Sequence, residues 1–179
     1  MNAVWRPHSA VTFDPTGNLR NCVRFLAKEM RNAAVELEVA VPETSRNVRG
    51  QPVQLEQVVM NLLGNARDAI VERRARDGQA APHGSIRLSL RDDRDHLLIE
   101  VTDNGGGIPA SILPHVFEPF FTTKTAGKGT GLGLSVGDAI IKAMGGSLSA
   151  TNVDDGACFS IRLPVAAGQK GGGKADVKQ

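Results

Sequence analysis

With 179 residues the chain is long enough for one domain with a substantial core, and two domains are not expected. Its 21 basic and 19 acidic residues leave a formal net charge of +2, which gives no electrostatic reason to expect binding to nucleic acid or to a membrane surface. The two cysteines, Cys22 and Cys158, have no metal-ligand spacing, and no apolar run approaches the ~20 residues that span a bilayer, so we expect a soluble protein of a reducing compartment.

The first half of the chain predicts two helices and two strands. Residues 1–13 carry no usable pattern and are assigned no role, but from residue 14 to residue 30 apolar side chains recur at helical spacing. Residues 35–39 alternate strictly between apolar and acidic side chains, as in a half-buried strand, and a short second strand is expected around residues 47–49. Residues 53–74 form the longest predicted helix, with one broad apolar face.

The polar face of that long helix carries a stripe of candidate binding residues. Asn61 and Asn65 are four positions apart and Asp68 follows three later, so all three share one face. Asparagine is a mediocre helix former, and its carboxamide oxygen is a suitable ligand for magnesium that also carries a triphosphate. A merely solvated polar face is the alternative. The arginines at the helix end need no more than the helix dipole to explain them: Arg73, Arg74 and Arg76.

The second half predicts two antiparallel hairpins and a third helix. Residues 86–90 and 97–103 form the first hairpin, turned by the charged cluster at 92–95. A helix over residues 136–144 ends at a Gly-Gly pair, and residues 147–153 and 158–163 form the second hairpin. Residues 165–179 are expected to be a flexible tail.

Two glycine clusters between these hairpins predict a nucleotide site. Asp103 ends a strand just before the first cluster, and an ionised carboxylate accepts hydrogen bonds, as the exocyclic amine of adenine requires. The second cluster opens a helix, whose free N–H groups and positive dipole end suit phosphate oxygens. Between the clusters we expect a hinged lid held by Phe117, Phe120 and Phe121.

Other glycine motifs fit less well. No Walker A spacing occurs, and the one dinucleotide-type match, at Gly105, Gly107 and Ala110, is interrupted by Pro109 and Pro114. Simple turn formation by the glycines is the remaining alternative.

The order of motifs resembles one family. QVVMNLLGNARDA, DNGGGIP, FEPFFTTK, GKGTGLGLS and a closing hairpin look like the successive boxes of the catalytic ATP-binding domain of bacterial sensor histidine kinases, over residues 14–164. The resemblance implies an α+β fold shared with type II topoisomerases and mismatch-repair ATPases. This fold is a two-layer sandwich with a mixed, mostly antiparallel sheet of about five strands, about three helices on one face and a mobile ATP lid.

By the resemblance, Asn65 would bind magnesium, Asn61 would support the metal and phosphate region and take part in catalysis, and Asp103 would bind the adenine amine. Gly105 and Gly107 would shape the adenine pocket. The residues implied to contact the phosphates are Lys124, which is also catalytic, and the loop residues Gly129, Thr130, Gly131, Leu132 and Gly133.

Three departures from the family pattern stand out. Asp68 and Ala69 replace a basic and an aromatic residue of the asparagine box. Ala157 and Cys158 stand where the closing strand usually opens with Gly and then Thr or Ser. Finally, none of the four histidines lies in the acidic, helical context of a phosphoacceptor: His8, His83, His96 and His115.

The expected function is therefore transfer of the γ-phosphoryl group of Mg-ATP to a histidine on a separate dimerisation and phosphoacceptor domain, with a response regulator downstream. We expect a monomeric, cytoplasmic catalytic domain whose parent protein can be membrane-anchored. Two alternatives stay open. An ATP-hydrolysing clamp of the same fold is disfavoured because such relatives carry Glu at the position of Asn61, and a nucleotide-sensing pseudokinase is kept open by Asp68 and Ala157.

Overall fold

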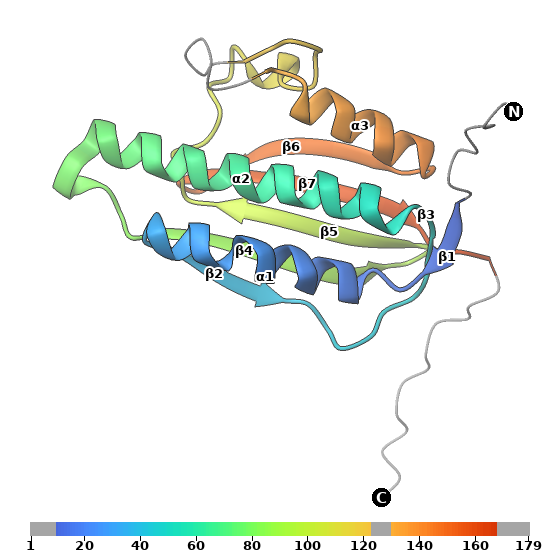
Figure 1. The fold of residues 1–179 in the computed structure, drawn as a ribbon. Coiled ribbons are helices and arrows are strands. Elements are labelled where there is room, and N and C mark those ends of the chain that lie inside the picture. Colours follow the sequence, from blue (N-terminus) through green and yellow to red (C-terminus); the bar gives the residue numbers. More distant parts are fainter. Residues whose placement is uncertain (1–9, 123–129, 168–179) are drawn as a thin grey trace, which may run out of the picture.

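The computed structural model describes residues 10–122 and 130–167, which build a sheet covered on one face by helices (Figure 1). The main sheet consists of β2 (Val35–Ala40), β4 (Gly84–Asp93), β5 (His96–Asp103), β6 (Ser147–Val153) and β7 (Gly156–Pro164). Its strand order is β2-β4-β5-β7-β6, with β2 parallel to β4 and every other pair antiparallel. The predicted mixed, mostly antiparallel sheet is confirmed.

The helices all lie on one face of this sheet (Figure 1). They are α1 (Thr16–Asn32), α2 (Pro52–Asp77) and α3 (Gly133–Ala143), with two short 3-10 turns, η1 (Gly78–Ala80) and η2 (Leu113–His115). The long helix α2 has Pro52 at its first position, where the missing N–H costs no helical hydrogen bond, and it ends at Gly78, whose φ of 58° few other residues adopt readily.

The core lies between the two layers. On α1 the buried residues recur at helical spacing, and on β4 they alternate with exposed ones, so each element turns one apolar face to the other layer. The largest fully buried side chains come from both layers and include Leu19, Leu55, Leu62, Leu63, Ile86, Leu88, Ile99 and Ile161.

A small second sheet joins the two described ends of the chain. β1 (Val11–Phe13), in a segment to which the sequence assigned no role, pairs antiparallel with β3 (Val48–Gly50), the short strand expected around 47–49. Val48 is fully buried and also bridges to Val165. Strand pairing therefore includes residues just outside the predicted domain limits of 14 and 164, namely β1 and Val165.

Two sequence expectations concern segments that the structure does not describe. Most of the expected lid falls on residues 123–129, and most of the expected tail on residues 168–179. Within the described ranges, no helix combines the length and the apolar character that a membrane crossing requires.

Candidate functional site

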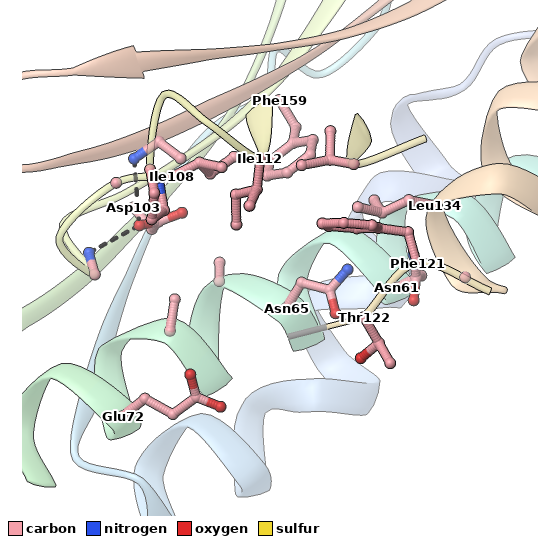
Figure 2. A pocket seen from close by; sticks show the side chains of 18 of the residues that line it. Asn61, Asn65, Glu72, Asp103, Ile108, Ile112, Phe121, Thr122, Leu134 and Phe159 are labelled. Carbon is pink, nitrogen blue, oxygen red and sulfur yellow. Dashed lines mark hydrogen bonds between the residues drawn. The ribbon is translucent and has the colours of Figure 1, made fainter. Parts of the chain in front are cut away.

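A cavity of about 760 Å³ opens between α2, the start of α3 and the end of β5 (Figure 2). It brings together most of the predicted site residues, which come from three separate stretches of sequence. Those lining it are Asn61, Asn65, Asp103, Gly105, Gly107, Thr130, Gly131 and Gly133. Leu132 instead lines a smaller groove of about 290 Å³ next to it. Lys124 and Gly129 lie outside the described residues.

Asp103 forms one end of the cavity. The residue is 6% exposed, and its Oδ1 accepts hydrogen bonds from the Gly105 N–H at 2.8 Å and the Ala157 N–H at 3.4 Å. Burial raises the pKa of this carboxyl, although the two amide hydrogen bonds oppose that shift. Figure 2 shows the other carboxylate oxygen pointing toward the cavity, where it can accept a hydrogen bond from a ligand.

The loop after Asp103 needs its glycines because it passes close to its neighbours. A Cβ on Gly105 would stand 2.7 Å from the Ala69 Cβ, so the small Ala69 and Gly105 together let this loop lie against α2. Gly107 has a φ of 74°, which favours glycine. The following residue, Ile108, is held by Asn152, whose carboxamide accepts from the Ile108 N–H and donates to the Ile108 carbonyl, each at 2.7 Å. Asn152 was not among the predicted site residues.

The other end of the cavity is formed by the start of α3. Gly131 has a φ of 66°, and a Cβ there would stand 2.5 Å from the Phe120 carbonyl carbon, so only glycine fits. Gly133 is the first residue of α3, and the first N–H groups of a helix have no helical acceptor. Together with the positive end of the helix dipole, they provide a site for anionic oxygens.

The side chains of Asn61 and Asn65 extend from α2 toward this end (Figure 2). The Asn61 Nδ2 is buried and has no hydrogen-bond partner within the described ranges, so it is a donor available to a ligand oxygen. No group of three or more histidine, cysteine or acidic residues in the part of the chain that the structure describes is placed so that it could hold a metal ion. A magnesium ion would fit here through the Asn65 carboxamide oxygen only if ligand phosphates and water completed its shell, as this ion commonly accepts.

Asp68, which shares the predicted polar stripe with these asparagines, does not line the cavity. Its Oδ1 accepts from the Arg67 guanidinium at 2.7 Å, and Arg67 also pairs with Glu29 of α1. The structure thus divides the stripe into two cavity residues and one residue that faces Arg67.

The structure corrects two of the sequence expectations, one on the phenylalanines and one on the start of β7. Phe120 is 75% exposed, so its side chain is not a buried anchor, whereas Phe117 packs edge-on against Phe159 with ring centroids 6.4 Å apart, and Phe121 lines the cavity. β7 opens on Gly156, so the glycine expected at its start is present, and Ala157 follows it in place of a hydroxyl residue.

The arginines at the end of α2 do more than complement the helix dipole. Arg73 and Arg76 line the cavity, and Arg73 also donates to backbone carbonyls of two loops. Sequence reasoning missed this role because a backbone carbonyl acceptor leaves no residue-type signal.

Comparison with known proteins agrees with this geometry. Residues 50–167 match the family described as histidine kinase-, DNA gyrase B-, and HSP90-like ATPase. The chain is 44% identical over 164 residues to the two-component sensor PprA of Pseudomonas aeruginosa and 40% identical over 148 residues to the sensor kinase CckA of Brucella abortus. These alignments cover 92% and 79% of this chain but 18% and 16% of the relatives, so the chain spans less than a fifth of their length.

Solved structures show the same fold. The catalytic domain of the histidine kinase ThkA superposes with a TM-score of 0.74 at 26% identity, over 88% of this chain and 96% of that one. The mycobacterial sensor histidine kinase MprB superposes with a TM-score of 0.71 at 27% identity, over 87% of this chain and 97% of that one. The chain belongs to the histidine kinase-, DNA gyrase B-, and HSP90-like ATPase family.

Proposed function

We propose that this domain binds ATP with magnesium and transfers the γ-phosphoryl group to a histidine on a separate dimerisation domain. One observation carries the proposal. A single cavity has at one end a buried carboxylate whose second oxygen points toward the cavity, and at the other end a helix N-terminus beside an amide donor that has no partner among the described residues. Adenine fits the first end and a polyphosphate fits the second.

In this arrangement the residues act by positioning and by charge. The free oxygen of Asp103 accepts the adenine amine, which fixes the base. The first N–H groups of α3 and the Asn61 Nδ2 donate to phosphate oxygens, and no covalent step on this domain is needed. The Asn65 carboxamide would hold magnesium, which neutralises phosphate charge when bound. Lys124, outside the described residues, is proposed as a γ-phosphate contact.

The competing function is ATP hydrolysis by a conformational clamp. Relatives of that kind carry a water-orienting Glu where this chain has Asn61, and a carboxamide is not a general base for water. We therefore propose slow hydrolysis by the isolated domain. Absence of both phosphoryl transfer and ATP hydrolysis would support the pseudokinase alternative, which Asp68 and Ala157 motivate.

The proposed partners are ATP or ADP, a phosphoacceptor domain of the longer protein and a response regulator. The histidine kinase ThkA, which shares this fold, forms a complex with the response regulator TrrA. We propose that the domain acts in the cytoplasm, where ATP is available, whether or not the longer protein is held in a membrane, and that in isolation it is a monomer.

Incubation with γ-labelled ATP tests the proposal. The domain alone should remain unlabelled and release phosphate slowly, and addition of its cognate dimerisation domain should give acid-labile label on that partner. Lys124→Ala should reduce this transfer more than it reduces ADP binding. Acid-labile label on this chain alone, or fast phosphate release, would contradict the proposed chemistry.

A further inference from the structure

Arg73 joins three segments around the Asp103 end of the cavity. It lies on α2 with a side chain that is only 16% exposed, and its Nη1 donates to the Asn104 carbonyl at 2.8 Å and to the Asp155 carbonyl at 3.0 Å. These acceptors belong to the loop that follows β5 and to the turn between β6 and β7. One guanidinium therefore connects a helix to two loops that are distant in sequence.

Both loops lead directly into the groups that orient Asp103. Asn104 lies between Asp103 and Gly105, whose N–H binds the Asp103 Oδ1, and Asp155 lies two residues before Ala157, whose N–H binds the same oxygen. The Asp155 carbonyl also accepts from the Gly106 N–H at 2.8 Å, so it is shared between Arg73 and the glycine loop. A displacement of either loop would move a donor away from Asp103.

The aliphatic stem of Arg73 has a close packing neighbour, and its charge has acidic ones. A Cβ on Gly106 would stand 3.5 Å from the Arg73 Cδ, so the glycine loop lies directly against the arginine stem. The Arg73 Nε is 3.4 Å from an Asp77 carboxylate oxygen, and a second guanidinium nitrogen is 3.7 Å from the Asp155 carboxylate. The guanidinium thus has two acidic neighbours in addition to its two carbonyl acceptors, and it is held in one place.

We propose that Arg73 is a positioning residue for base recognition, because it fixes the loop after β5 to the β6–β7 turn and so directs the free oxygen of Asp103 at the base. The proposal rests on the proposed function, in which that oxygen accepts the adenine amine. Arg73 acts through Asp103, so it should affect the choice of base more than the grip on the phosphates.

The test compares ADP with inosine diphosphate, which carries a carbonyl oxygen where ADP carries the amine. In the unaltered domain the Asp103 hydrogen bond should favour ADP about tenfold or more, measured by calorimetry with magnesium present. Arg73→Met keeps an unbranched stem and removes the donors. It should weaken ADP binding by about three- to tenfold and inosine diphosphate binding by less than about twofold, so the preference shrinks.

Arg74 provides a matched control on the same helix. It also donates to two backbone carbonyls, Ala33 at 2.5 Å and Ala34 at 2.6 Å, but these lie between α1 and β2, and Arg74 does not line the cavity. Arg74→Met should therefore lower the melting temperature about as much as Arg73→Met and leave the preference for ADP unchanged. A purely structural role of Arg73 would make the two variants indistinguishable in this ratio.

The outcomes separate the proposal from its alternatives. An unchanged preference in Arg73→Met, or an equal loss of both nucleotides, would overturn it, because direct contact with the nucleotide or general loosening would affect both ligands alike. If Arg73→Met does not fold, Arg73→Lys should give a preference between those of the unaltered domain and Asp103→Asn, and a fully retained preference would overturn the bridging role. Failure of the unaltered domain to bind ADP would instead overturn the proposed function itself.

Discussion

The Asn61 carboxamide lies directly against Gly133, such that a Cβ on that glycine would stand 2.3 Å from the Asn61 Oδ1. The contact links α2 to the first residue of α3. It places the buried Asn61 Nδ2, which has no hydrogen-bond partner in the ranges 10–122 and 130–167, beside the start of that helix. Space for the asparagine side chain therefore depends on the absence of a side chain at Gly133.

Gly133→Ala should keep the fold and weaken Mg-ATP binding. The atom in the way is the end of a movable side chain, so Asn61 can rotate aside, and Ala is a better helix former than Gly. The displaced amide then no longer faces the phosphates, and we expect a loss of about tenfold or more in affinity, measured by calorimetry. The control is Gly137→Ala on the same helix. Its added Cβ would stand 3.4 Å from the Val58 Cγ1, and this variant should bind Mg-ATP as the unaltered domain does.

Asn65→Ala should reduce the part of nucleotide affinity that depends on magnesium. The side chain lines the cavity and is not among the buried apolar residues of α2, so the fold should persist. Titrations of ADP with magnesium and with a chelator separate the two contributions. If the variant and the unaltered domain bind ADP equally well in magnesium, Asn65 is only part of a solvated polar face and does not bind the ion.

Asp103 should make folding stability and ADP affinity depend on pH in opposite directions. Burial raises its pKa in the folded chain above the unfolded value, so its contribution to the free energy of unfolding is full below the unfolded pKa and declines as pH rises through the folded pKa. The carboxylate that accepts the adenine amine is the ionised form, so ADP affinity should fall as pH drops through the same folded pKa.

Calorimetric ADP titrations from neutral to acidic pH check this, with Asp103→Asn as the reference. The variant should bind ADP more weakly and lack the acidic decline, because its amide does not titrate there. Among the described residues, the other charged groups that line the cavity are Glu72, Arg73 and Arg76, and they are present in both proteins. An acidic decline of equal size in Asp103→Asn would assign it to another group.

Two glycine substitutions should have opposite effects on stability. A Cβ on Gly156 would stand 1.7 Å from the Asp103 carbonyl oxygen, and backbone cannot move aside as a side chain can, so Gly156→Ala should cost about 2 to 4 kcal/mol of the free energy of unfolding. A Cβ on Gly64, inside α2, would meet nothing within 4 Å, and Gly64→Ala should add about 0.5 to 1 kcal/mol. Urea unfolding measures both changes.

The sequence predicted the main helices and strands because their signals are local. The four-residue spacing of Asn61 and Asn65 places both on the cavity side of α2, and the position of Asp103 at the end of an apolar strand places it at the loop. Periodicity and chain position predict such placements, although Asp68, at the same helical spacing, faces Arg67 and does not line the cavity.

Features that depend on distant backbone were not predictable. Arg73 meets carbonyls of residues 31 and 82 positions away, and Asn152 holds a loop 44 positions away, so no short-range pattern marks either. Phe120 looks like an apolar contact in sequence, yet it has a φ of 66° and is 75% exposed. β1 has three residues, which is too short a stretch for a strand period to be recognised.

The two pairings of Val48 determine where a stretching force would act on the domain. Val48 pairs with Phe13 of β1 on one side and bridges to Val165 on the other, and the Ala166 N–H donates to the Asn47 carbonyl at 2.8 Å. A force applied to residue 10 or to residue 167 would therefore load the same three-way junction, at the end of the sheet away from Asp103 (Figure 1). In a stretching experiment through these positions this junction should part first, and the force needed should not change when ADP is added.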